Sequence, residues 1–317
     1  MRTAPLCLLP VLVLTGCTYT SRVSTATNEK QVSLSEARRD FKTKLIPQEE
    51  ARRPVEAPPP NLFRTVQYPS PVGNLAAYLS PDPGGKQKHP AIIWIHGGDY
   101  NTIDGDCWKV GFANNDQSAH AFRDAGIIMM FPSLRGGNEN AGVKESFLGE
   151  VDDVLAAADW LAQQEYVDPS RIYLGGHAEG GTLVFLVSAC SNRFRAVFSF
   201  GPVSDVSEYK SEHLPFDKEN PREIEIRSPG HWLHSIQSPT FVFEGNRKPS
   251  NITSIAIMML SSTNPKLHFH PINGEDHFSI LAPTTALIAS KIPDDHGITT
   301  NLRFPEERQI EIELPRN

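Results

Sequence analysis

The chain has 317 residues, of which 30 are basic and 37 acidic, so its formal net charge at pH 7 is −7. An acidic chain without a basic stripe repels phosphate, which argues against a nucleic-acid-binding protein. Hydrophobic residues make up 39% of the chain, enough for a packed core and too many for disorder throughout. No run approaches the ~20 apolar residues of a membrane span, which excludes a multi-span membrane protein.

The amino-terminal residues 1–16 have the features of an export signal. Arg2 precedes the apolar stretch Leu6–Leu14, and small residues follow at the expected cleavage point. Residues 14–17 read Leu-Thr-Gly-Cys, which resembles the lipobox of bacterial lipoproteins. That resemblance implies diacylglycerol on Cys17, cleavage before it and acylation of the new amino terminus. The alternative is an ordinary cleaved signal with an incidental cysteine.

The same resemblance predicts where the protein resides. Two or three acyl chains hold a protein stably on a membrane, whereas one is marginal. Thr18 rather than aspartate after the lipidated cysteine implies the outer membrane of a bacterial cell envelope, facing the periplasm. We therefore expect a membrane partner through the lipid anchor.

Residues 17–61 are expected to form a lipidated, polar and proline-rich tether. Charges and the run Pro58-Pro59-Pro60 favour extended, solvated chain. The sequence Glu-Ala-Arg-Arg occurs at 36–39 and again at 50–53. It is compatible with a short amphipathic helix that docks elsewhere, but the pattern favours a solvated spacer.

From residue 62 the chain alternates between strand and helix patterns. Continuous apolar runs predict strands buried on both faces of a parallel sheet, and residues with 3–4 spacing predict helices. The expected strands are Phe63–Tyr68, Leu75–Leu79, Ala91–Ile95, Ile127–Phe131, Arg171–Leu174, Ala196–Phe200, Thr240–Phe243 and Leu267–His270. The expected helices are Ser118–Asp124, Phe147–Gln164, one following Gly181, and Pro283–Ile292. This order predicts an α/β fold, a mostly parallel sheet with helices on both faces.

The cysteines and histidines do not point to a metal or cofactor. Cys107 and Cys190 are the cysteines left in the folded part, and their separation does not indicate a disulfide although an oxidising periplasm permits one. The pairs His268/His270 and His231/His234 are more typical of strand and loop surface than of metal ligands. We expect neither a metal nor a cofactor.

The motifs that carry chemistry lie at the ends of predicted strands. Residues 176–180, Gly-His-Ala-Glu-Gly, stand between a strand and a helix, the position of the G-x-S-x-G nucleophile elbow. A strained turn of this kind needs residues without Cβ. His96-Gly97-Gly98 follows an earlier strand, and His277 follows the last main strand.

Together these motifs resemble an α/β-hydrolase of the prolyl-oligopeptidase-like serine peptidase and esterase branch. The run 168–177, Asp-Pro-Ser-Arg-Ile-Tyr-Leu-Gly-Gly-His, resembles the approach to the nucleophile in that branch. The resemblance covers residues 62–293 and leaves 294–317 as a carboxy-terminal tail. It implies ester or peptide hydrolysis by a serine, histidine and acid triad, with His277 as base and backbone oxyanion donors at Gly98 and Glu179.

The elbow, however, holds Ala178 where the family has serine. A methyl group cannot attack a carbonyl or hold an acyl intermediate, so the nucleophile position is lost. The acid is also altered, because Arg247 and Lys248 stand where the family usually has aspartate. Glu244 is the first candidate for the acid, and Asp205 and Asp276 are alternatives.

Two explanations of Ala178 remain open, a naturally retired hydrolase and a serine replaced to trap a substrate. The altered acid position favours a natural alanine. Two functions follow: a serine hydrolase by ancestry, impaired in this chain, or a non-catalytic lipoprotein that reuses the pocket for a small ester, a short peptide or an unknown protein partner. The segment Gly201–Pro239, with Trp232, leaves room for a modest lid. The tail residues Ile310–Leu314 alternate like an edge strand.

Overall fold

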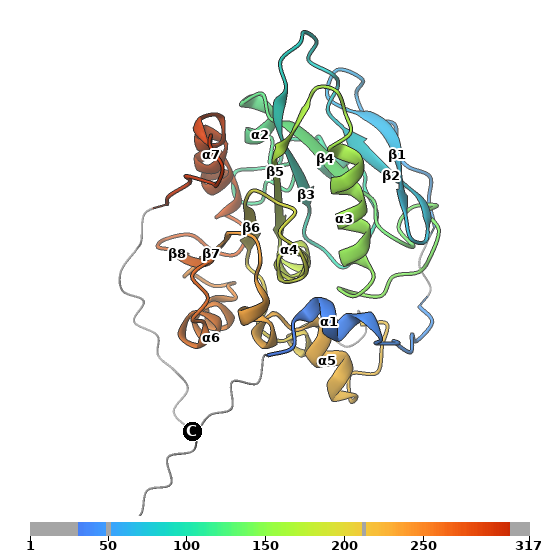
Figure 1. Ribbon diagram of the computed structural model, residues 1–317, viewed down its shortest axis with the longest axis vertical. Helices are drawn as coiled ribbons and strands as arrows, with labels where there is room; N and C mark the ends of the chain where they lie inside the picture. The colour runs from blue at the N-terminus through green and yellow to red at the C-terminus, as the bar shows by residue number, and fades with distance from the viewer. Residues whose placement is uncertain (1–30, 49–51, 211–213, 305–317) are drawn as a thin grey trace, which may run out of the picture. The chain divides into compact units, whose positions relative to one another are not determined.

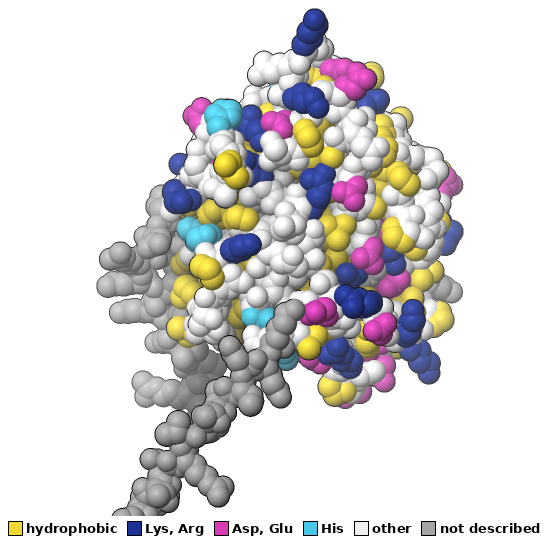
Figure 2. Space-filling view, in the orientation of Figure 1, with side chains coloured by type: hydrophobic (Ala, Val, Ile, Leu, Met, Phe, Trp, Pro, Cys, Tyr) yellow, Lys and Arg dark blue, Asp and Glu magenta, His cyan; other side chains and the backbone are white. Residues whose placement is uncertain are grey.

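A computed structural model describes residues 31–48, 52–210 and 214–304. The predicted signal, Cys17 and the alternating tail residues Ile310–Leu314 lie outside this part of the chain. Within it, no helix is long and apolar enough to cross a bilayer. Figure 2 shows basic and acidic side chains interspersed over the visible face of the molecule, so this face carries no single-sign patch.

Eight strands form one sheet in the order β1-β2-β4-β3-β5-β6-β7-β8. Their bounds are β1 (Arg64–Ser70), β2 (Gly73–Leu79), β3 (His89–Ile95), β4 (Ile128–Pro132), β5 (Val167–His177), β6 (Val197–Phe200), β7 (Thr240–Gly245) and β8 (Leu267–Ile272). The strands expected at Phe63–Tyr68 and Leu75–Leu79 form an antiparallel hairpin, in which Ser70 pairs with Gly73 across the β1–β2 turn. The pairs β1–β2 and β2–β4 are antiparallel and the others are parallel.

Helices cover both faces of this sheet (Figure 1). Their bounds are α1 (Leu34–Arg39), α2 (Ala121–Asp124), α3 (Glu150–Leu161), α4 (Glu179–Cys190), α5 (Pro221–Arg227), α6 (Ile252–Ser261) and α7 (Leu281–Lys291). Short 3₁₀ turns lie at η1 (Gly105–Cys107), η2 (Val206–Glu208), η4 (Pro229–His231), η5 (Leu233–Ser235) and η6 (Ile292–Asp294). One core joins α3, α4 and α6 to one face, and a second joins α2 and α7 to the other. The predicted α/β-hydrolase fold is confirmed.

Helices α3, α5 and α6 differ from the sequence prediction, which expected an earlier start for α3 and no helix at α5. The helix expected from Phe147 begins instead at Glu150, because Ser146 and Phe147 have φ of 48° and 67°, outside helical values. Helix α6 was not predicted. Its sequence is apolar on nearly all sides, and Ile257 and Leu260 are exposed, so no amphipathic period marks it.

The described part of the predicted tether is packed against the domain, which corrects the expectation of a solvated spacer. Ser33 and Glu36 form a capping box that starts α1, and Leu34 is fully buried in the core. Arg38 Nη2 donates to Asp152 Oδ2 at 2.9 Å. The sequence alone could not favour this helix, because six residues are too few to be stable without the packing that the fold supplies.

Farther along the same segment, Leu45 bridges to Phe216 and Arg53 pairs with Asp104 at 2.8 Å. The described residues of the predicted lid segment between Gly201 and Pro239 form α5 and several short turns. Trp232 is buried there, and its Nε1 donates to the Glu225 carbonyl at 2.8 Å. Cys107 and Cys190 are free thiols.

Candidate active site

The turn between β5 and α4 has the conformation of a strained elbow. Ala178 lies between the last residue of β5 and the first of α4 with φ 54° and ψ −115°. Non-glycine residues rarely adopt positive φ, and such strain clusters at functional sites. A Cβ at Gly176 would lie 2.6 Å from the Gly180 carbonyl oxygen, and one at Gly180 would overlap the Ile95 carbonyl. The need for glycine on both sides of position 178 therefore follows from close backbone approach.

Glu244 and His277 are brought together from the ends of two different segments. His277 Nδ1 lies 3.2 Å from Glu244 Oε1 and 3.3 Å from Oε2, and the carboxylate is fully buried at the end of β7. Asn251 N donates to Glu244 Oε1 at 2.8 Å. Gly201 leaves room for the pair, because a Cβ there would lie 2.5 Å from His277 Cε1. This geometry can orient the imidazole as the acid of a triad does.

The other candidate acids serve elsewhere in the described structure. Asp205 accepts from Ser207 N and caps η2. Asp276 accepts from Arg247 Nη2 at 3.1 Å and from Ser279 N at 2.9 Å. Neither carboxylate contacts the imidazole of His277, whereas Glu244 does. The argument that the acid position is altered, which favoured a natural alanine at 178, is therefore weakened.

Both predicted oxyanion positions lie beside Ala178, but a carboxylate already occupies one donor. Gly98, with φ 108°, and Glu179 line the same cleft as Ala178 and His277. The Gly98 N–H donates to Glu179 Oε2 at 3.2 Å. A carboxylate at this donor opposes an oxyanion in two ways, because it accepts the hydrogen bond and adds negative charge.

Gln117 and His177 connect three loops around position 178, and sequence reasoning missed both. Gly97 N donates to Gln117 Oε1 at 2.9 Å, and Gln117 Nε2 lies 2.9 Å from His177 Nδ1. His177 Nε2 lies 2.8 Å from the carbonyl of His277. The carbonyl must accept, so Nε2 carries the proton and Nδ1 accepts from Gln117. Only the histidine in the Gly-His-Ala-Glu-Gly motif gave a signal for this network.

Burial, together with the nearby His277, lowers the pKa of His177 to about 3. The folded protein therefore keeps His177 neutral at pH values where the unfolded chain, with a pKa near 6.5, binds a proton. Stability must fall as pH drops below about 6.5. Between pH 7.5 and 5.0 we expect His177 to account for about 2 kcal/mol of lost unfolding free energy.

Urea unfolding at both pH values, for the natural chain and for His177→Gln, measures this contribution. The variant should lose about 2 kcal/mol less than the natural chain over that interval, whatever its stability at pH 7.5. Equal losses in the two proteins would show that His177 is not held neutral.

The cleft around these residues has a volume of about 530 Å³ and includes Tyr100, Val203, Tyr209 and Phe278 in its walls. This size is typical of small-molecule sites. No group of three or more potential metal ligands occurs among the described residues, and the histidine pair at 268 and 270 stacks on Phe241.

Comparisons with known proteins place this geometry in a family. The model of the prolyl oligopeptidase family matches residues 113–278, just over half of the chain. The dual function macrocyclase-peptidase POPB of Amanita bisporigera is 32% identical over 124 residues, which are 33% of this chain and 17% of that protein. The chain thus matches only a small part of this larger relative.

Solved structures agree in fold. A puromycin-hydrolyzing peptidase of Mycobacterium tuberculosis superposes with a TM-score of 0.60 at 19% identity, over 73% of this chain and 39% of that one. An esterase from Pyrobaculum calidifontis superposes with a TM-score of 0.56 at 17% identity, over 73% of this chain and 85% of that one. At these identities the likeness concerns the fold alone.

Proposed function

The chain belongs to the prolyl oligopeptidase family, and we propose that its hydrolase domain binds a small ester or short peptide without acyl transfer. One observation carries the proposal: the elbow, the buried Glu244 and the imidazole of His277 are assembled, yet position 178 presents a methyl group. Without a hydroxyl no acyl-enzyme forms. A cleft of about 530 Å³ remains for a ligand.

The test is covalent labelling of the full chain that carries Ala178 with a serine-reactive fluorophosphonate. We expect no adduct, because the probe needs an activated hydroxyl. A stoichiometric adduct that disappears in His277→Ala would contradict the proposal, since it would reveal a second nucleophile served by the same imidazole.

A second candidate is an ester or peptide hydrolase that has lost only its nucleophile, so that the chain with Ala178 is inactive and a serine at this position would restore hydrolysis. The contact between His277 and Glu244 supports it, because a long-abandoned site has no need to keep a buried carboxylate beside an imidazole. Both candidates predict no acyl transfer by the chain with Ala178. They differ in whether a serine at position 178 would restore hydrolysis.

We further propose that the protein is a lipoprotein of the bacterial outer membrane, anchored through Cys17. The Leu-Thr-Gly-Cys motif supports this, and the proposal concerns residues outside the described part of the chain. Metabolic labelling with a fatty acid should mark the natural chain and place it in the membrane fraction. Cys17→Ser should lose both properties, and a variant that stayed acylated on the membrane would contradict the anchor.

A further inference from the structure

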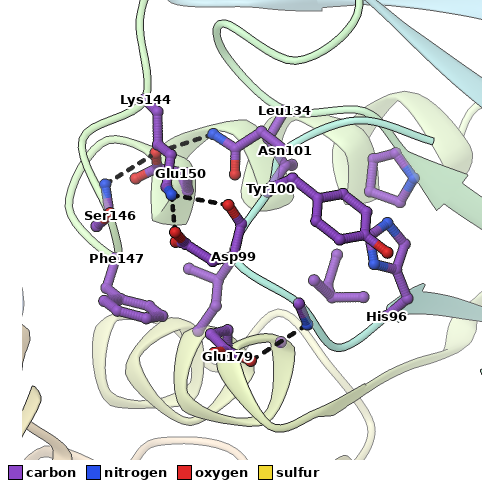
Figure 3. A pocket seen from close by; sticks show the side chains of 15 residues that line it. His96, Asp99, Tyr100, Asn101, Leu134, Lys144, Ser146, Phe147, Glu150 and Glu179 are labelled. Carbon is purple, nitrogen blue, oxygen red and sulfur yellow. Dashed lines mark hydrogen bonds and ion pairs between the residues drawn. The ribbon is translucent and has the colours of Figure 1, made fainter. Parts of the chain in front are cut away.

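Glu179 stands where three hollows meet beside position 178. It borders the 530 Å³ cleft, a side pocket of about 230 Å³ that also includes Phe147 and Tyr209, and a small cavity of about 40 Å³. Among the residues that line these hollows, Glu179 is the one shared by all three. Figure 3 shows the small cavity, with the Glu179 side chain at its edge and the bond to the Gly98 amide.

The carboxylates around these hollows differ in how they are compensated. Asp99 is paired with Lys144. Glu208 accepts from Ser254 Oγ at 2.7 Å and, in the capping box of η2, from the backbone N–H of Asp205. Glu179 accepts only the Gly98 N–H, and no lysine or arginine in the described part of the chain lies within ion-pair distance of it. Lys210 lines the side pocket together with Glu179, and Lys144 lines the small cavity, but neither forms an ion pair with Glu179 among the described residues. The carboxylate of Glu179 is therefore without an ion-pair partner in this part of the chain.

The small cavity contains a second, independent sign of a missing donor. Glu150 is 1% exposed, and its Oε1 accepts from Glu145 N at 2.7 Å, Ser146 N at 3.1 Å and Asn101 Nδ2 at 3.1 Å. Its Oε2 has no hydrogen-bond partner among the described residues, and neither has the buried hydroxyl of Ser146. Buried polar atoms are nearly always hydrogen-bonded. The cavity exceeds the ~10–15 Å³ that one water-sized group occupies, so a ligand's N–H group fits there.

Burial and nearby negative charges raise the pKa values of two tyrosines that line the cleft. Burial and then the charge of Glu179 raise the pKa of Tyr209. Burial, followed by Asp104 and Asp106, raises the pKa of Tyr100 to about 12. A ligand that brings positive charge into the cleft meets a favourable field, whereas a carboxylate or phosphate meets repulsion.

We propose that the pocket around Glu179 binds an ammonium or guanidinium group of the ligand, with Glu150 Oε2 in the adjoining small cavity as a second acceptor. This inference rests on the proposed ligand-binding function and names the chemistry that the site selects. The cation forms a charge-assisted hydrogen bond to Glu179 and carries N–H donors toward the cavity. The rest of the ligand occupies the 530 Å³ cleft.

Calorimetric titration of the full natural chain with two matched probes tests the proposal. Nα-acetyl-arginine methyl ester and Nα-acetyl-citrulline methyl ester have nearly the same shape, and only the first carries a charge. We expect the arginine ester to bind about 10-fold more tightly at low salt, with the preference shrinking as salt rises. Glu179→Gln, which keeps size and shape, should abolish the preference, while the exposed and distant control Glu165→Gln should keep it.

Equal affinities for the two probes, or a preference that survives Glu179→Gln, would overturn the inference. Its failure is distinguishable from failure of the proposed function. Equal but measurable binding of both probes leaves ligand binding intact and rejects only charge selection. A stoichiometric fluorophosphonate adduct that disappears in His277→Ala would reject the non-catalytic function whatever the probes show.

Discussion

Ala178→Ser is expected to convert the natural chain into an esterase, with a gain of about 10³ in kcat/KM for a short-chain nitrophenyl ester. Removal of the serine from an intact triad costs on the order of 10⁶ in kcat, so its return could supply that much. The hydrogen bond from the Gly98 N–H to Glu179 reduces this gain, because the loss of one oxyanion donor lowers kcat by a factor of about 10²–10³. We expect the serine to adopt the backbone conformation of Ala178, which has φ 54°.

Two controls separate the hydroxyl from the rest of the substitution. Ala178→Gly relieves the backbone strain but supplies no nucleophile, so it should stay inactive. Ala178→Ser/His277→Ala should lose the gain, because the hydroxyl then lacks its base. The measurement is the initial rate of nitrophenol release for the four proteins. If the Ala178→Ser variant is no faster than the chain with Ala178, more than the nucleophile is missing.

In the Ala178→Ser background, Glu179→Ala is expected to raise kcat by a further factor of about 10². The substitution frees the Gly98 N–H from Glu179 Oε2 and removes a negative charge from the place where the oxyanion develops. The gain belongs to kcat more than to KM, since the released donor acts on charge that exists only in the transition state.

Glu179→Gln in the same background is the matched comparison. It removes the charge but keeps an amide oxygen able to accept from Gly98, so its gain should be smaller than that of alanine. Steady-state kinetics with one neutral ester compare the three variants. If neither substitution changes kcat, the bond between Gly98 and Glu179 does not limit catalysis.

The parts of the fold and site that the sequence predicted are those set by local pattern. Apolar runs such as Ala91–Ile95 identified the buried strands, and the glycines around position 178 identified the elbow. Glu244 was the first candidate for the acid because it ends a strand beside the site, and the contact with His277 agrees with that choice. Each of these signals is contained in a few consecutive residues.

The features that sequence analysis missed depend on contacts between distant segments. Leu34 is buried only because α1 meets the rest of the fold, and its own six-residue helix carries no such information. Gln117 reads as an ordinary polar residue until the fold places it between Gly97 and His177. The hydrogen bond between Glu179 and Gly98 likewise joins residues that are 81 positions apart in the sequence. No local sequence pattern therefore predicts it.

The central claim is that one hydroxyl oxygen at position 178 separates this chain from covalent catalysis. The most direct test is a burst experiment that follows nitrophenol release during the first turnover. The enzyme concentration is high enough for one equivalent of nitrophenol to be measured. The acyl adduct is then mapped by mass spectrometry. The account predicts no burst from the natural chain, and from Ala178→Ser a burst approaching one equivalent with the adduct on residue 178. A burst from the natural chain, or an adduct on any other residue, would contradict it.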